Sequence, residues 1–336
     1  MKASDTRRAR RVALDFTVLG LGGAPLGNLF RAVSDDAASS VVDAAWDAGM
    51  RYFDTAPLYG HTLAEHRLGH GLRERPRNEF ILSTKVGRLL RPRRAPDLAD
   101  GAWIDPLPFE PVFDYSHVGV MRSFEDSLQR LGVARIDLVL VHDIGELTHG
   151  VTHAQRWHQL TAQGGLKALA ELRQEGQIRA FGLGVNEVQA VRDVMAVAEI
   201  DVVLLAGRHT LLEQSGLDLL DDCAARDISV VIGGPFNSGI LVSGSAHPGN
   251  YDYGLAPEAV VAKVRALEAV CEVYSLPLAA AAIQFPLAHA AVVSCIPGCA
   301  SVDELQQCVA WLEHPIPAAF WAELRYRGLL DCPAPC

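Results

Sequence analysis

The strongest constraint on the fold is a repeated alternation of short apolar segments with amphipathic helical patterns. Eight apolar segments have the length of a strand, and several lack the polar alternation of a half-exposed strand. They are VLGLGG (18–23), RYFDT (51–55), FILSTK (80–85), IDLVLVH (136–142), RAFGLGV (179–185), DVVLLAG (201–207), SVVIGG (229–234) and AVVSCIP (291–297). Such strands are typical of parallel sheets that helices cover on both faces.

Helical patterns follow these segments, and several end at a glycine. They lie at 36–49, 61–72, 119–132, 163–176, 186–199, 212–227, 257–274 and 301–313, with a further helix at 317–330. For the first helix, Ser39 or Asp36 is the expected N-cap and Gly49 the expected stop. Eight strand–helix units predict a closed (β/α)8 barrel, the TIM barrel, with right-handed crossovers. An open doubly wound sheet is the alternative.

Composition indicates a chain long and apolar enough for one large core, and it bears on the choice of partner. The chain has 336 residues, is 49% hydrophobic and carries a formal net charge of −10. An excess of acid argues against nucleic acid or an anionic membrane as partner, and no apolar run reaches the roughly 18 residues of a membrane span. Five of the seven cysteines lie in apolar or helical surroundings, as reduced thiols do, which favours a cytoplasmic location. We expect one domain over 1–336, with 1–15 as a solvated lead-in and 331–336 as a tail.

Three connections, at 87–116, 143–160 and 235–256, are unusually long. Each follows the C-terminal end of a predicted strand, so all three would crowd the barrel rim that carries the site in enzymes of this architecture. In the first, Trp103 and Phe109 are candidates for the substrate pocket. The basic stretch RLLRPRR (88–94) is interpreted as solvated loop.

Polar side chains stand where neighbouring apolar segments stop. Asp54 ends the second strand with Tyr59 just beyond it, Lys85 ends the third strand, and His142 ends the fourth. In a barrel these groups would converge. A phenol ordinarily titrates near ~10, and we expect the ammonium of Lys85 to lower that pKa. Asp54 would hold the ammonium in place and the imidazole would orient an alcohol or carbonyl oxygen, so the set can move a proton on and off that oxygen.

The motifs FDTAPLYG (53–60), STK (83–85) and LVLVHD (138–143) resemble the Asp, Tyr, Lys and His tetrad of the aldo-keto reductases. The resemblance runs through nearly the whole chain. It is closest to the aldose 1-dehydrogenase branch, which acts on L-fucose, D-arabinose and similar sugars, and to the related pyridoxal dehydrogenases. It implies a nicotinamide-dependent oxidoreductase with catalytic residues Asp54, Tyr59, Lys85 and His142.

The resemblance also implies where the nucleotide lies. GLGGAPLG (20–27) is not a Rossmann fingerprint, because Pro25 replaces the third glycine. The residues expected around the nucleotide are Gly22, Gly23, Asn186, Phe236, Asn237, Ser238, Gly239, Gly298, Ser301, Glu304 and Gln307. The stretch 298–308 has Glu304 and no basic residue, which predicts NAD over NADP unless an arginine reaches in from another loop. His209 replaces a frequent tyrosine beside the substrate.

The predicted reaction is oxidation of an aldose at its anomeric carbon to the lactone. Oxidation of pyridoxal and a broad carbonyl reductase activity are the enzymatic alternatives. A Schiff base on Lys85, as in class I aldolases, and a nucleotide-binding regulatory subunit are the alternatives from other classes. No metal site is expected, because the histidine pairs His66/His70 and His149/His153 lack the further ligands that a metal needs.

Overall fold

The computed structural model describes residues 1–93, 101–252 and 254–331. Eight parallel strands form its central sheet, one at each of the predicted segments. Their spatial order is β3 (Leu21–Gly22), β4 (Tyr52–Asp54), β5 (Ile81–Val86), β8 (Leu138–His142), β9 (Ala180–Val185), β10 (Val202–Ala206), β11 (Ser229–Gly233) and β14 (Val292–Ile296).

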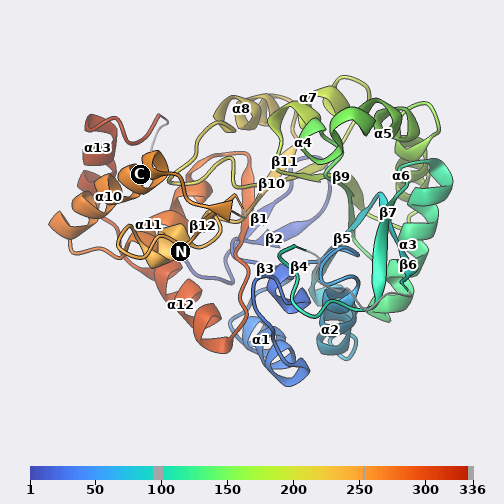
Figure 1. The fold of residues 1–336 in the computed structure, drawn as a ribbon, viewed down its shortest axis with the longest axis horizontal. Coiled ribbons are helices and arrows are strands. Elements are labelled where there is room, and N and C mark those ends of the chain that lie inside the picture. Colours follow the sequence, from blue (N-terminus) through green and yellow to red (C-terminus); the bar gives the residue numbers. More distant parts are fainter. Residues whose placement is uncertain (94–100, 253, 332–336) are drawn as a thin grey trace.

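The sheet closes on itself to form a barrel. Parallel bridges join Leu19 to Cys295 and Gly22 to Gly298, and the Gly20 amide donates to the Cys295 carbonyl at 3.0 Å. Figure 1 shows the strands at the centre with helices arranged around them. The predicted (β/α)8 barrel is therefore confirmed, and the open doubly wound alternative is wrong.

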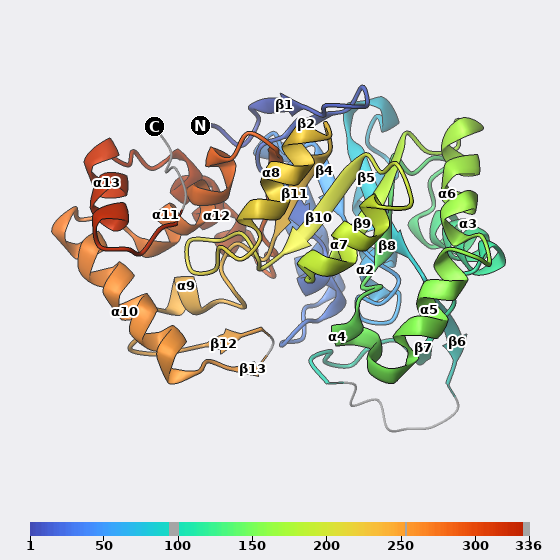
Figure 2. The same cartoon turned by 90° about the horizontal axis from the view of Figure 1, so that it is seen from above.

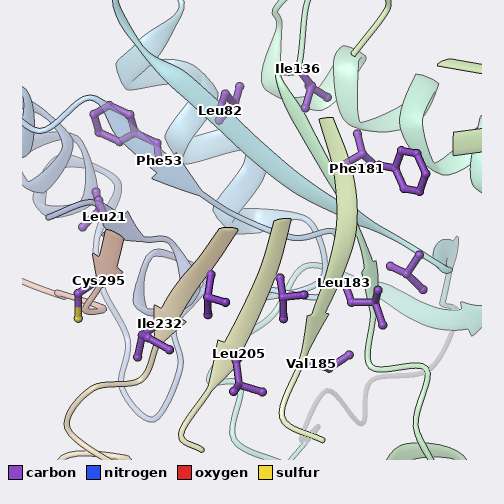
Figure 3. Close-up of a cluster of buried hydrophobic side chains, with 14 of the residues drawn as sticks. Leu21, Phe53, Leu82, Ile136, Phe181, Leu183, Val185, Leu205, Ile232 and Cys295 are labelled. Carbon is purple, nitrogen blue, oxygen red and sulfur yellow. The ribbon is translucent and has the colours of Figure 1, made fainter. Parts of the chain in front are cut away.

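Amphipathic helices cover most of the barrel, and their apolar faces pack against the outward side chains of the strands. Figure 3 shows three of these strand side chains, Leu21, Phe53 and Leu183. The first helix begins after Ser34, whose hydroxyl accepts the Ala37 amide at 3.2 Å, so Ser39 and Asp36 are not its cap. The covering helices are α1 (Asp35–Asp47), α2 (Leu63–Leu72), α3 (His117–Leu131), α6 (Gly165–Gln174), α7 (Val188–Met195), α8 (Leu217–Ala225) and α12 (Val302–Glu313).

The helix before β14 differs from the sequence prediction. The predicted helix 257–274 forms as α10 (Glu258–Val273), but it packs against α13 (Ala318–Tyr326) in a separate apolar core beside the barrel. A shorter helix, α11 (Leu278–Gln284), instead packs beside α12 and leads through the 3-10 helix η4 (Phe285–Ala288) into β14. Its alanines are buried all round, so its sequence lacks the amphipathic period by which a helix is recognised.

The N-terminal segment is also structured. It forms an antiparallel hairpin of β1 (Thr6–Arg8) and β2 (Asp15–Thr17), in the range predicted as a solvated lead-in. Leu14 and Phe16 are buried, and Phe16 packs edge-on against Tyr52 with ring centroids 4.8 Å apart. The hairpin therefore fills one end of the barrel interior.

The three long connections gather at the opposite end of the barrel (Figure 2). The first forms a hairpin, the second forms helices, and the third carries a short helix and a small hairpin. These elements are β6 (Arg88–Pro92) and β7 (Phe109–Phe113); α4 (Glu146–His149), η3 (Gly150–Thr152) and α5 (His153–Leu160); α9 (Ile240–Ser243), β12 (Asn250–Tyr251) and β13 (Gly254–Leu255). Two further 3-10 helices, η1 (Ala24–Gly27) and η2 (Arg77–Glu79), follow β3 and precede β5.

The structure also bears on the cysteines and on the question of a membrane span. The described cysteines, Cys223, Cys271, Cys295, Cys299 and Cys308, are buried and unbridged. Cys332 and Cys336 lie outside the described residues, so the predicted tail is not described either. In the ranges that the structure describes, no single helix is both long and apolar enough to cross a membrane.

Candidate active site

A buried ion pair links the ends of β4 and β5. The Lys85 ammonium donates to Asp54 Oδ2 at 2.7 Å and to the Thr55 carbonyl at 2.9 Å. The other carboxylate oxygen of Asp54 accepts the Ser83 hydroxyl at 2.6 Å. Burial raises the pKa of Asp54, and the Lys85 ammonium is the strongest opposing influence. Both side chains are about 98% buried, so the pair has one fixed geometry.

The neighbouring strand β9 makes room for the lysine through Gly184. A Cβ at this position would lie 3.0 Å from Lys85 Cε, which is closer than side chains normally pack. Gly184, the second glycine in RAFGLGV, therefore serves the site. An isolated glycine in a strand signals such a close approach, although it does not say which neighbour needs the space.

Tyr59 and His142 complete the group. The Lys85 ammonium lies 4.6 Å from the centroid of the half-buried Tyr59 ring. The His142 ring lies edge-on to the Tyr59 ring at 5.9 Å, and the Trp103 ring lies 5.6 Å from it. The structure thus brings Asp54, Tyr59, Lys85 and His142 together at the rim, with Trp103 beside the tyrosine.

The protonation of Tyr59 differs from the expectation. Its pKa is raised well above 10, first by burial and then by the carboxylates of Asp54 and Asp143. The ammonium lies over the ring face and is already paired with Asp54, so it does not offset the loss of water around the phenol. The expected lowering of this pKa is therefore wrong for the protein alone, and Tyr59 is a protonated phenol.

His142 is held as a neutral imidazole. Burial is the main cause that lowers its pKa well below 6.5, and the cations of Arg88 and Lys85 lower it further. Its Nδ1 is buried without a hydrogen-bond partner among the described residues, whereas Nε2 lies 3.4 Å from Asp143 Oδ2. A neutral ring with its proton on Nε2 can donate one hydrogen bond to a substrate oxygen.

A cleft runs from Tyr59 and Asp54 across the barrel mouth toward α12. Its volume is about 510 Å³, within the range of cofactor sites. The residues predicted to surround a nucleotide lie along it, with one exception. Those that line it are Gly22, Gly23, Asn186, Phe236, Asn237, Ser238, Gly239, Gly298, Glu304 and Gln307.

One detail of the lining suits a bound nucleotide, and a second has a purely structural cause. Asn186 Oδ1 is buried and has no partner among the described residues, so a ligand amide could pair with it. Gly23 lines the same cleft for a different reason: a Cβ there would lie 2.6 Å from the Asp54 carbonyl oxygen. This glycine therefore sets the approach of the β3 turn to β4, whatever else it contacts.

An arginine reaches the far end of the cleft. Arg31, in the loop after β3, donates to Glu304 Oε1 at 2.5 Å, and both residues line the cleft. The other oxygen of Glu304 accepts the Ala300 amide at 2.8 Å. Sequence reasoning did not find Arg31, because its distance from Glu304 along the chain hides the contact.

Three predicted site residues lie elsewhere. Ser301 does not line the cleft, and its hydroxyl caps α12 by accepting the Glu304 amide at 3.3 Å. His209 is buried against Phe285, with ring centroids 5.1 Å apart, and also lies outside the lining. Phe109 pairs with Pro92 at the end of the β6–β7 hairpin and does not line the cleft either.

Arg88 also departs from its expected role as solvated loop. It is 8% exposed and donates to Asp143 Oδ2 at 2.6 Å, directly beside His142. The sequence does not identify Arg88 as a buried residue, because it lies in a basic stretch whose other arginines are expected to be solvated.

Fold and site together define a barrel oxidoreductase, and the chain belongs to the Aldo/keto reductase family, which it matches over residues 18–326. Enzymes of this family use a nicotinamide nucleotide and act on small molecules. This membership confirms the predicted resemblance.

Two of the similar relatives are dehydrogenases by name. The chain is 47% identical to the pyridoxal 4-dehydrogenase of Microbacterium luteolum, covering 98% of this chain and 99% of the relative. It is 40% identical to the D-threo-aldose 1-dehydrogenase of a Pseudomonas species, covering 97% and 98%. A solved aldo-keto reductase from Bacillus halodurans shares the fold, with a TM-score of 0.75 and 22% identity over 98% of both chains. The chain is thus an oxidoreductase.

Proposed function

We propose that the protein oxidises a ring hydroxyl at a hemiacetal carbon to the lactone, as an aldose 1-dehydrogenase with NAD as acceptor. L-Fucose and D-arabinose are the expected sugars. The observation that carries the proposal is the convergence of the Lys85–Asp54 ion pair, Tyr59 and His142 at one end of the cleft. The 40% identity to an aldose 1-dehydrogenase supports the choice of substrate.

The side chains divide the proton chemistry among them. His142 Nε2 donates a hydrogen bond to the reacting oxygen and holds it near the Tyr59 hydroxyl. Tyr59 takes the hydroxyl proton during oxidation and returns it during reduction. Lys85 and Asp54 supply a fixed positive charge beside the phenol and keep the ring in place. A bound nicotinamide would supply the acceptor for the hydride on the reacting carbon, and the positive charge of its oxidised form would favour loss of the Tyr59 phenolic proton.

Glu304 and Arg31 bear on the choice of nucleotide. In NAD a ribose hydroxyl can donate to the Glu304 carboxylate, which the Ala300 amide already orients. An NADP 2′-phosphate carries about two negative charges and would have to displace Glu304 from Arg31. Arg31 is the arginine from another loop that could favour NADP, but it is already paired with Glu304, so the existing ion pair supports NAD.

Substitution of Glu304 tests this preference. Glu304→Gln should lower the ratio of kcat/KM with NAD to kcat/KM with NADP by about tenfold or more, because Arg31 becomes free for a charge-assisted bond to phosphate. Glu313→Gln, on the exposed end of the same helix, is the matched control and should leave the ratio unchanged. An unchanged ratio in Glu304→Gln would remove Glu304 from cofactor selection.

Pyridoxal oxidation is the second candidate, and the 47% identity to a pyridoxal 4-dehydrogenase favours it. Pyridoxal also forms a ring hemiacetal, so the same proton steps apply. The test is a panel of aldoses and pyridoxal, each assayed with NAD and NADP for the absorbance rise at 340 nm. A sugar with the highest kcat/KM supports the first candidate and pyridoxal the second. No turnover on any of them would contradict both.

A further inference from the structure

A buried charge pair lies beside His142 and has no direct part in the proton transfer described above. Arg88 opens strand β6, and Asp143 directly follows His142 at the end of β8. The Arg88 guanidinium donates to Asp143 Oδ2 at 2.6 Å, and the same oxygen lies 3.4 Å from His142 Nε2. The pair is therefore in contact with the nitrogen that would hold the reacting oxygen.

The scaffold around the pair fixes its position. The buried Tyr115 hydroxyl donates to the His142 carbonyl at 2.6 Å and lies 3.4 Å from the Asp143 carbonyl oxygen. The Asp143 backbone has a φ of 44°, a left-handed conformation that residues other than glycine adopt only rarely. The Arg88 guanidinium lies over the Phe113 ring at 5.1 Å. Hairpin, strand end and aromatic ring thus hold both charges in one place.

Each partner also has unused hydrogen-bonding capacity. Arg88 is 8% exposed, and its Nε is buried with no hydrogen-bond partner among the described residues. Asp143 Oδ1 has no described donor, and the carboxylate side chain is 22% exposed. A ligand hydroxyl can reach the partly exposed Asp143 carboxylate, whereas the buried Arg88 Nε shows only that Asp143 does not fill the hydrogen-bonding capacity of the guanidinium.

The neighbouring charges favour a ligand that is neutral and rich in hydroxyls. Asp143 feels the cations of Arg88 and Lys85 and the nearby carboxylate of Glu187, and its burial raises its pKa. An anionic ligand would meet Asp143 and Glu187, whereas a cationic ligand would meet Arg88 and Lys85. A hydroxyl can donate to the carboxylate and accept from the guanidinium without adding charge.

Resting on the proposed function, we propose that Arg88 and Asp143 form a second hydroxyl-binding subsite, which takes the hydroxyl on the carbon next to the one oxidised. Oxygens on neighbouring ring carbons lie within hydrogen-bonding distance of each other. With the reacting oxygen on His142 Nε2, the next hydroxyl lies beside Asp143, which contacts that nitrogen. The favoured substrate class is a vicinal diol that contains the hemiacetal carbon, as in an aldose.

The test compares two sugars that differ only in this hydroxyl, D-arabinose and 2-deoxy-D-ribose. Binding is measured by calorimetry on the Tyr59→Phe protein with saturating nucleotide, so that no turnover interferes. D-Arabinose should bind about 10- to 100-fold more tightly, the usual gain of a hydrogen bond to a charged group. Asp143→Asn and Arg88→Lys, each added to Tyr59→Phe, should reduce this ratio toward one.

Glu146→Gln is the matched control, because Glu146 is an exposed acid three residues from Asp143 in the same connection. It should keep the ratio. Equal binding of the two sugars before substitution, no binding of either, or a ratio that survives both Asp143→Asn and Arg88→Lys would overturn the subsite. Failure of the proposed function is a separate result, namely no NADH formation by the unsubstituted protein with any sugar or pyridoxal.

Discussion

Tyr59 lies beside one ammonium and two carboxylates, and the balance among them sets its protonation. Lys85 lies over its ring, but the ammonium is neutralised by Asp54, and Asp143 adds a second negative charge nearby. The phenol therefore stays protonated in the protein alone, ready to act as an acid. As a base it needs further positive charge, which the oxidised nicotinamide would bring.

This balance predicts how reduction depends on pH. With NADH bound, kcat/KM for reduction of a small aldehyde should be constant from pH 6 to 9. The pKa of Tyr59 is raised, so the acid is protonated throughout, and the pKa of His142 is lowered, so the imidazole is neutral throughout. Steady-state rates across this range check the prediction, and a fall with an apparent pKa near 7 or 8 would contradict it.

At the residue scale, sequence reasoning predicts side chains that stand at strand ends. Asp54, Lys85 and His142 each interrupt an apolar run, so they are visible without a structure. Arg31 and Arg88 cannot be identified in this way. The long side chain of an arginine can lie in solvent or fold inward, and the sequence does not distinguish these two conformations. The structure shows where each side chain lies, because Arg31 pairs with Glu304 and Arg88 pairs with Asp143.

The hairpin of β1 and β2 is the element whose contribution the sequence hides most. Its strands are short and half polar, so they resemble a solvated terminus, yet Phe16 is fully buried in the barrel interior. The eight barrel strands are the opposite case, because burial on both faces makes them apolar throughout. Helix α11 is hidden for another reason, since its buried alanines show no amphipathic face.

Truncation of Phe16 measures what the hairpin contributes. Phe16→Ala removes an aromatic ring that packs on Tyr52 and should lower the free energy of unfolding by about 3 to 5 kcal/mol. Tyr326→Ala, an aromatic truncation at a residue 88% exposed on α13, should change it by about 0.5 kcal/mol or less. Urea denaturation of both variants makes the comparison, and equal effects would mean that the hairpin does not support the barrel.

Besides His142, two further buried histidines in separate parts of the molecule are held neutral. Burial is the main cause that lowers the pKa of His149, at the rim, and of His209, between the barrel and η4, to about 4 in each case. In the unfolded chain both return to about 6.5. Protons therefore bind the unfolded state first as the pH falls.

The free energy of unfolding should then decrease between about pH 6.5 and pH 4, by up to about 3 kcal/mol for each histidine. Denaturation curves at pH 7, 5.5 and 4.5 measure the decrease. In His209→Gln, which cannot take up a proton, the decrease should be smaller than in the unsubstituted protein. The same decrease in both proteins would exclude His209 as a source of the acid sensitivity.

The central claim is that Tyr59 exchanges the substrate proton at the rim of the barrel, and the rate of the Tyr59→Phe protein tests it most directly. NADH formation with the best substrate of the panel should fall by about 100- to 10,000-fold, the usual contribution of acid–base catalysis. Nucleotide affinity, measured in parallel, should stay unchanged because only one hydroxyl is lost. A Tyr59→Phe protein that turns over at nearly the original rate would contradict the account.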